Sequence, residues 1–507
     1  MSKVSWGKFV DDWNENDLPY DFRPILFLRG SAYEMGKQYG EAMSTLIKRN
    51  FCACEGIVLR GILDKPADVL DSHEKEIEDS IEVQIEKMRE YTPDIMKYWE
   101  GMADGAGVTL CDIGLINLFM WYTGLFEEHC STIAAKDSCT VDGKVICGIN
   151  DDVTWANNGY GPIIMAFPDE GNAFLTVPGI AGQLSCNFAM NEKGLAITFT
   201  GGECARPEDL AGDYWDFITL LNNMVWKCDT AAEAKAMFDK VPVKGGWSFL
   251  FADAGRDISI TEATSAISHN RVPGDHGEKD FILVTNHFVD EGMRVASFPG
   301  YEDSYNRYNT EEKLLHENHG HIDLTALKNI LGCPDYWDGQ SWHMNSWGFG
   351  DLATATEHSM FTPEMRFPDF KPAFRCLAEP EDRKAHILMG GRDLGNAYCV
   401  RPMGQYLTLH VGPNEAAVCN EADQDAMMEI WEAARFISQN DCPDKDKRLG
   451  ELSEAKAAFW QGRNCQAKAE CSRRDAAKAR KHYAEATSCY TKTMLLARKA
   501  READQLV

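Results

Sequence analysis

The sequence lacks the short motifs that indicate the commonest cofactor and metal sites. Its 507 residues contain no Gly-x-Gly-x-x-Gly after a strand, no phosphate-binding P-loop and no His-Glu-x-x-His helix. The histidine-rich stretch from His316 to His321 has the wrong spacing for a zinc helix, and we interpret it as a polar turn after a helix. The stretch from Gly339 to His343 is not a Gly-x-Ser-x-Gly elbow. The sequence therefore predicts neither a bound cofactor nor a bound metal.

Positive charge and long apolar runs are also scarce. The formal net charge is −28, from 51 Lys and Arg against 79 Asp and Glu, which argues against binding of nucleic acid or an anionic membrane over most of the surface. A basic group from Arg473 to Lys481 fits a solvated helix face. No apolar run reaches the length of a membrane span, and the first residues have no apolar signal region. We expect a cytoplasmic protein without a membrane span or a nucleic-acid partner.

Cysteine is plentiful, but its spacing predicts no disulfide framework. There are 17 cysteines, an odd number, and none of them form a Cys-x-x-Cys pair. Without a secretory signal, we expect mostly reduced thiols in a cytosol-like compartment. A thiol with a chemical role must therefore be recognised by its surroundings.

One stretch combines a thiol with carboxylates within reach of a single hairpin. His129-Cys130-Ser131-Thr132 begins a short apolar run, Asp142-Gly143-Lys144 forms a turn, and Gly148-Ile149-Asn150-Asp151-Asp152 ends a second run. Two such runs joined by turn residues predict a β-hairpin, which would return Asp152 to Cys130. A thiol becomes a catalyst when a base, a fixed neighbour and an oxyanion donor surround it. A buried structural cysteine is the alternative explanation for the same pattern.

The rest of the chain predicts a mixture of helices and strands. Ser31 and Glu34 form a capping-box pattern before a helix to about Arg49. Periodicity predicts further helices at 71–106 with a break near Thr92-Pro93, and at 110–125, 214–226, 231–238, 303–318, 324–331 and 417–438. Strands are expected at 25–28, 163–167, 173–177, 184–189, 195–200, 248–251, 258–262 and 281–285, with more in 353–362 and 386–411. Strand runs flanked by helices indicate sheets covered by helices, an α+β class.

The C-terminal part has a different composition. Residues 445–505 are rich in Ala, Lys, Arg and Glu, with a weak break around Gly462-Arg463-Asn464, and predict either a helical hairpin or one long helix. We divide the chain into a mostly helical part at 1–129, a core at 130–412 and a helical extension at 413–507. The extension offers a surface for a homo-oligomer.

Five motifs, in order along the chain, resemble the N-terminal-nucleophile (Ntn) hydrolases. Cys130-Ser131-Thr132, a Gly turn and then Gly-x-Asn-x-Asp is similar to the acyl-CoA:6-aminopenicillanate acyltransferases and the related choloylglycine hydrolases. The other four similar segments are Leu28–Ser31, Trp99–Val108, Met190–Ile197 and Thr285–Phe288. The resemblance covers roughly residues 25 to 375 and says nothing about the C-terminal helices.

The resemblance implies a four-layer αββα sandwich and self-processing. In the family, the protein cuts the bond before its nucleophilic cysteine, and the freed α-amine then serves as the base for that thiol. The corresponding bond here is His129–Cys130, so residues 1–129 would become a separate chain. The family usually has Gly where this chain has His129, a larger residue that restricts the backbone before the cysteine.

The same resemblance implies roles for three further residues. Asn150 and Asp152 match the Asn-x-Asp pattern, whose Asp would orient the new α-ammonium, and Asn286 matches the oxyanion-hole Asn. Ile149 stands where the choloylglycine hydrolases have Arg, which argues against bile-salt-like activity. Their second oxyanion Asn would fall near Gly201, where a backbone N–H would have to replace it.

The sequence thus predicts a cysteine Ntn-hydrolase that hydrolyses or transfers an acyl group at a linear amide through a thioester on Cys130. Its substrate would be a small-molecule acyl amide or acyl donor. Two alternatives stay open. A phospholipase-B-like Ntn hydrolase acting on lipid acyl esters is suggested by His129-Cys130-Ser131 and the later Thr154-Trp155. The other is a catalytically inactive scaffold of the same fold that uses its helical tail for assembly.

Overall fold

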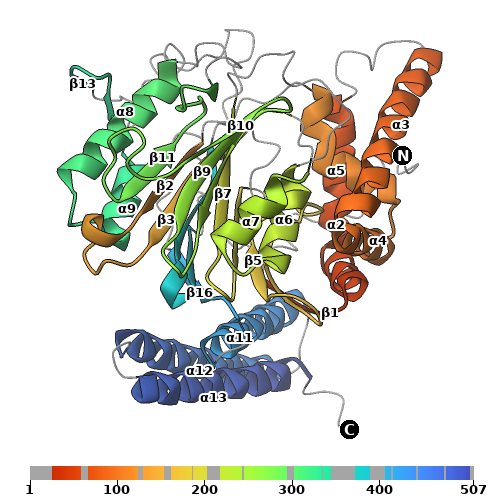
Figure 1. Cartoon of the computed structure of the whole chain (residues 1–507). Helices are drawn as coiled ribbons and strands as arrows, with labels where there is room; N and C mark the ends of the chain where they lie inside the picture. Colours follow the sequence, from red (N-terminus) through yellow and green to blue (C-terminus); the bar gives the residue numbers. More distant parts are fainter. Residues whose placement is uncertain are drawn as a thin grey trace. The chain divides into compact units, whose positions relative to one another are not determined.

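The structure of the chain is a computed structural model (Figure 1). It describes residues 25–58, 67–123, 130–153, 161–184, 187–202, 217–241, 245–293, 302–333, 335–343, 371–388, 406–412, 415–440, 444–472 and 476–502. Contacts divide the chain into two units, Met1–Val411 and Gly412–Val507. Helices and sheets are mixed throughout the first unit, which confirms the α+β class.

The larger sheet has eight strands in the order β1-β4-β5-β6-β7-β8-β9-β10. Their bounds are β1 Ile25–Gly30, β4 Ile163–Pro168, β5 Phe174–Thr176, β6 Phe188–Asn191, β7 Ala196–Gly201, β8 Trp247–Ala252, β9 Ile258–Ala263 and β10 Ser268–Arg271. β1 pairs with β4 in parallel, from Ile25 opposite Ile163 to Gly30 opposite Pro168. The other neighbours are antiparallel. The N-terminal strand is therefore an edge strand of the main sheet.

The smaller sheet has six strands in the order β11-β2-β3-β14-β15-β16, all antiparallel. They span β2 Ser131–Ala135, β3 Ile146–Val153, β11 Phe281–Val284, β14 Lys371–Glu379, β15 Lys384–Leu388 and β16 Tyr406–His410. A separate pair joins β12 Tyr336–Trp337 to β13 Trp342–His343. The predicted hairpin after Cys130 is thus formed by β2 and β3, which are interior strands of this sheet.

Helices pack on both sheets. The helices that fall between strands of the larger sheet in the sequence are α2 Ala32–Val58, α3 Ala67–Tyr91, α4 Pro93–Ala106, α5 Leu110–Thr123, α6 Phe217–Lys227 and α7 Ala231–Phe238. Two more helices follow β11, namely α8 Glu302–Glu317 and α9 Leu324–Leu331. The predicted capping box begins α2: the Ser31 N–H donates to Glu34 Oε2 at 2.8 Å, and the Glu34 N–H donates to Ser31 Oγ at 3.4 Å. Pro93 starts α4 directly after α3 ends at Tyr91, as the sequence predicted.

Two hydrophobic clusters explain the layering. The first cluster contains Phe199, Phe249 and Phe251 of the larger sheet together with residues of the helices α2 to α7, and Figure 1 shows α6 and α7 in front of that sheet. The second cluster joins Ile260 of the larger sheet to Ile149 of the smaller sheet and reaches residues of α8 and α9. Full burial of one such side chain is worth about 1.5–3 kcal/mol, so the apolar contacts between the sheets hold the region around the hairpin in place.

Four of the described strands were not predicted: the short pair β12 and β13, and the sheet strands β10 and β14. β10 is formed by Ser-His-Asn-Arg, whose first three residues are exposed at the sheet edge, so it lacks the apolar alternation that marks a strand. β14 contains Pro372 and Arg375, and Pro usually argues against a central strand. The ladder between β14 and β3 is irregular between Pro372 and Phe374, where a bulge accommodates the Pro. The predicted strand at 353–362 lies outside the described residues.

The second unit is formed by α11 Glu415–Gln439, α12 Lys445–Cys471 and α13 Ala476–Glu502. Of the two forms that the sequence allowed for residues 445–505, it has two helices rather than one. The predicted break at Gly462 is wrong, because α12 continues through it. A Cβ at Gly462 would lie 2.5 Å from Cε1 of Tyr490 on α13, so the glycine allows close helix packing and does not end the helix.

Candidate active site at Cys130

Cys130 directly precedes β2 and is fully buried. In the hairpin, Ser131 pairs with Asn150 and Ala135 pairs with Ile146. The turn between the strands contains Gly143 with φ of 76°, a left-handed conformation that glycine adopts without strain. The sequence prediction of a thiol at the head of a hairpin is therefore confirmed.

The thiol lies between the two sheets. Asn187, immediately before β6 in the larger sheet, donates from Nδ2 to Cys130 Sγ at 3.5 Å. Two residues along β2, the Thr132 hydroxyl hydrogen-bonds the hydroxyl of Thr198 on β7. Because side chains alternate along a strand, Ser131 lies on the other face, together with its partner Asn150. The inner face of this hairpin thus carries the sulfur.

The backbone of Cys130 is held as well as its sulfur. Its N–H donates to Asn286 Oδ1 at 2.9 Å, and its carbonyl accepts a hydrogen bond from the guanidinium of Arg307 on α8. Arg307 also donates to Asn286 Oδ1 at 2.8 Å and to Ser131 Oγ at 3.3 Å. Asn286 Nδ2 donates to the Gly201 carbonyl at 3.0 Å. Two donors on Oδ1 and an acceptor at Nδ2 fix the orientation of this amide.

Asn286 is positioned by a buried polar network. It follows β11, and its N–H donates to Ser304 Oγ at 2.9 Å. The Thr285 hydroxyl donates to the Ser304 carbonyl at 2.9 Å, and the Thr200 hydroxyl donates to the Thr285 carbonyl at 2.7 Å. His287 Nδ1 lies 2.8 Å from Ser304 Oγ. Segment 285–287 is therefore clamped between β7 and α8, which leaves the Asn286 side chain little freedom.

A buried triad of ionised side chains holds the residues that follow Asn286. Arg271 on β10 pairs with Glu262 at 2.9 Å and with Glu278 at 3.2 Å, and all three side chains have no exposed surface. Glu262 also accepts hydrogen bonds from the N–H groups of Val289 and Asp290. The segment after Asn286 is thus fastened to the larger sheet, whereas Ser304 fastens Asn286 to α8.

Two other cysteines of the hairpin provide a contrast within it. Burial raises the pKa of the Cys147 thiol to about 12 and the pKa of the Cys139 thiol to about 11. At neutral pH both are therefore protonated and unreactive, as expected for structural cysteines. Neither carries the backbone contacts with Asn and Arg that surround Cys130.

The structure brings together only some of the predicted site residues. Cys130 and Asn286 are in direct contact. Asn150 lies on the opposite face, where its Oδ1 accepts hydrogen bonds at 3.0 and 2.8 Å from Arg375 of β14. The backbone of Asp152 pairs with Pro372 at the same end of the hairpin as Cys130, but its side chain lies outside what the structure describes. His129 also lies outside the described residues. The catalytic roles of these residues stay predictions.

Sequence reasoning missed two residues at the site, Asn187 and Arg307. Ser304 and Arg307 lie three residues apart on α8 and share one helix face, but nothing in the sequence places that face beside Cys130. Asn187 had no signal. It stands in a stretch predicted as strand 184–189, whereas β6 begins at Phe188, and nothing in Asn187-Phe188 distinguishes it from a strand end.

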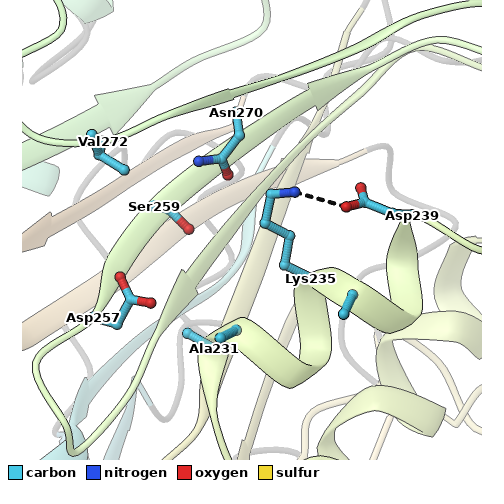
Figure 2. Close-up of a pocket in the computed structure, with 9 residues that line it drawn as sticks. Ala231, Lys235, Asp239, Asp257, Ser259, Asn270 and Val272 are labelled. Carbon is cyan, nitrogen blue, oxygen red and sulfur yellow. Dashed lines mark hydrogen bonds and ion pairs between the residues drawn. The ribbon is translucent and has the colours of Figure 1, made fainter.

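A surface pocket lies elsewhere, between α7 and strands β9 and β10 (Figure 2). It has a volume of about 230 Å³ and is lined by Ala231, Ala232, Lys235, Ala236, Asp239, Asp257, Ser259, Asn270 and Val272. Lys235 and Asp239 form an ion pair at 2.7 Å along α7. The pocket contains no residue of the Cys130 site.

The histidine-rich stretch has ordinary structural contacts. The His316 ring packs edge-on against Phe281, with centroids 4.9 Å apart, and His319 Nε2 lies 3.1 Å from the Lys279 carbonyl. Within the described ranges, no group of three or more His, Cys, Asp or Glu side chains could hold a metal. In those same ranges, no helix is long and apolar enough to cross a membrane.

Comparison with known proteins supports the resemblance found in the sequence. The model of the acyl-coenzyme A:6-aminopenicillanic acid acyl-transferase family matches residues 139–347. The match confirms the resemblance to this family over a range that includes Asn150, Asp152 and Asn286 but begins after Cys130.

Two further proteins match the chain over longer ranges. An uncharacterized protein of Archaeoglobus fulgidus is 24% identical over 359 residues, which are 61% of this chain and 57% of that protein. This chain therefore spans little more than half the length of that relative. The crystal structure of a variant of conjugated bile acid hydrolase from Clostridium perfringens aligns with a TM-score of 0.33 and 12% identity, covering 56% of this chain and 99% of the other.

Proposed function

We propose that this chain is a self-processing Ntn enzyme that hydrolyses or transfers an acyl group at a linear, non-peptide amide through a thioester on Cys130. The supporting observation is the set of contacts at Cys130. Its nitrogen, its carbonyl and its sulfur each have a polar partner from a different part of the fold, namely Asn286, Arg307 and Asn187. A structural cysteine needs only its sulfur packed, whereas an Ntn nucleophile also needs its nitrogen held, because that nitrogen is the base.

Self-cleavage comes first in this proposal. Cys130 Sγ attacks the carbonyl carbon of His129, the peptide C–N bond breaks, and the Cys130 nitrogen takes up the thiol proton. Water then hydrolyses the resulting thioester. The products are residues 1–129, with a new carboxylate, and a chain that begins at the α-amine of Cys130.

In turnover, the α-amine takes the thiol proton and the sulfur attacks the acyl carbonyl of the substrate. A free α-amine has an ordinary pKa near 8, so it is a competent base at neutral pH. Asn286 Oδ1 would keep this amine aligned as it now aligns the N–H. The guanidinium of Arg307, which donates to the same oxygen, would disfavour the charged ammonium and so favour the base.

The tetrahedral intermediate then collapses and expels the amine of the substrate, which receives the proton from the α-ammonium. Attack of water on the thioester completes hydrolysis, and attack of a second amine completes acyl transfer. The second N–H of the Asn286 amide is the proposed oxyanion donor. Asp152 is proposed to hold the α-ammonium, and Asn150 to brace β3 through Arg375.

The proposal extends to the architecture. The two sheets with their covering helices are proposed to be the αββα sandwich of the Ntn hydrolases, with residues 130–412 as the catalytic core. Residues 413–507 are a helical extension available for a homo-oligomer. An amide is favoured over a lipid ester because the acceptor in the matching family's description, 6-aminopenicillanic acid, is an amine.

Intact-mass analysis of the purified protein, followed by assays on N-acyl amides and lysophospholipids, tests this proposal. We expect two chains divided between His129 and Cys130, and cleavage of N-acyl amides. Turnover of lysophospholipids alone would favour the lipid-ester alternative. A single uncut chain without activity on either substrate would indicate a scaffold, and a fully active uncut chain would rule out the α-amine as base.

A further inference from the structure

We propose that the side-chain amide of Asn187 is the second donor to the oxyanion formed during acyl transfer at Cys130. This inference rests on the function proposed above. The tetrahedral intermediate of acyl transfer usually has two hydrogen-bond donors aimed at its oxygen. Asn286 offers one of them, and the side chain expected near Gly201 is absent because glycine occupies that position. Asn187 supplies the missing amide from the neighbouring strand.

The distance to the sulfur supports this role. Asn187 Nδ2 lies 3.5 Å from Cys130 Sγ and points at it as a donor. In the intermediate, the oxyanion sits on the carbon bonded to Sγ, so it is only two bonds from the sulfur. A donor that already touches the sulfur can therefore reach the oxyanion with a small movement of substrate or side chain.

The strand pairing explains how Asn187 replaces a residue near Gly201. β6 and β7 form a hairpin in which Phe188 pairs with Thr198, and the Phe199 N–H donates to the Asn187 carbonyl at 3.4 Å. Asn187 and Gly201 thus lie at the same open end of one hairpin. The Gly201 carbonyl accepts from Asn286 Nδ2, so this end faces the other oxyanion residue.

Burial makes the donor effective. Asn187 is 1% exposed and Cys130 has no exposed surface, so no water competes for the oxygen. A neutral thiol sulfur is a weak acceptor, and a buried amide N–H gains less from it than from a carbonyl or an anion. The full value of this donor is therefore realised only when negative charge develops beside the sulfur, as it does in the transition state.

The test compares Asn187→Leu with the parent protein on an N-acyl amide that the parent cleaves. Leu has a similar branched shape, so it removes the donor without adding a charge. We expect kcat to fall about a hundredfold with KM nearly unchanged, the usual effect of losing one oxyanion donor. The aldehyde analogue of the substrate's acyl group forms a tetrahedral adduct with the thiol, and its affinity should fall by a similar factor. The carboxylic acid product should bind as before.

Asn191→Ala is the matched control. Asn191 ends the same strand, is also buried, and donates to the carbonyls of Val225 and Cys228, away from the thiol. It should lower the melting temperature and leave kcat within about threefold. If Asn187→Leu folds but is not cut, the slowed self-cleavage counts in favour, because that acyl shift forms an oxyanion at the same sulfur.

The inference is overturned if folded, processed Asn187→Leu retains kcat within about threefold of the parent, or if it changes aldehyde and product affinity equally. Asn187→Ala repeats the measurement should the Leu variant not fold. The failure of the underlying function has a different signature: Cys130→Ala would then remain active, whereas an inactive Cys130→Ala beside an active Asn187→Leu rejects only the role of Asn187.

Discussion

The site at Cys130 and the pocket beside α7 differ in almost every respect. The first has a cysteine with no exposed surface. Its sulfur accepts a hydrogen bond from Asn187 just before β6, its carbonyl accepts one from Arg307 of α8, and its N–H donates to Asn286 after β11. The second is an open hollow of about 230 Å³ whose charged pair, Lys235 and Asp239, satisfies itself along one helix turn. Space alone therefore does not indicate chemistry in this molecule. Converging partners on one nucleophile are the better guide.

The largest difference between the two places should appear when the thiol is removed. Cys130→Ala should abolish both self-cleavage and turnover, because no sulfur is left for either acyl transfer. Cys147→Ala, in the same hairpin, should keep both and cost about 1 kcal/mol of stability through lost packing. Intact mass and amidase rates compare the two variants. Activity that survives in Cys130→Ala would remove the basis for distinguishing this site from the pocket.

The second-largest loss of activity is expected from changes at the two carboxylates near the end of β3. Asp152→Asn should lose most activity and slow processing, because the α-ammonium would lose its charged partner. Asp151→Asn, one position along the strand, should be nearly silent, because the Gly-x-Asn-x-Asp pattern assigns the partner of the ammonium to Asp152 and not to its neighbour. Both variants are assayed on the same acyl amide. An inactive Asp151→Asn beside an active Asp152→Asn would mean that the assigned register is wrong by one residue. The role assigned to Asn150 would then be wrong as well.

Asn286→Ala should lower kcat about a hundredfold and raise KM far less, the usual effect of losing one oxyanion donor. Steady-state kinetics on the processed protein measure both constants. The paired control is Asn172→Ala, which removes a buried amide that donates to the Cys228 carbonyl and to Asp229, remote from the thiol. Full activity in folded, processed Asn286→Ala would contradict its assignment.

The pocket should give the smallest effect. Lys235→Ala breaks an ion pair on the surface of α7, which is worth a few tenths of a kcal/mol, and Asn270→Ala changes the opposite wall. Neither should change kcat on acyl amides by more than about twofold. A large loss of kcat in either variant, without loss of folding, would connect the pocket to the reaction and reverse the comparison drawn above.

Much of the fold near Cys130 could be predicted because it depends on local signals. The hairpin follows from two apolar runs around Gly143, and α2 follows from the reciprocal capping of Ser31 and Glu34. The missed strands β10 and β14 depend on their neighbours: one is polar at an edge, and the other tolerates Pro372 through an irregular ladder. Pairing across a sheet supplies what their own sequences do not indicate.

The site was only partly predictable for the same reason. Cys130 and Asn286 stood in recognisable motifs, and they do touch. Asn187 and Arg307 reach the thiol region from strands and helices that no local pattern connects to it. Asn150 fits its motif but faces Arg375 on the outer side of the sheet, a partner 225 positions away that only the fold could reveal.

The place of β1 bears on what a cut before Cys130 would produce. Residues 25–30 form a parallel edge of the larger sheet, and the Tyr39 hydroxyl and the Asn50 amide of α2 donate to the Gln183 and Ala181 carbonyls beyond the cut. After a cut before Cys130, the N-terminal chain would thus remain bound to the other chain. The two fragments of one polypeptide would form a non-covalent heterodimer. Native gel filtration would report one particle, and only denaturant would reveal the two fragments.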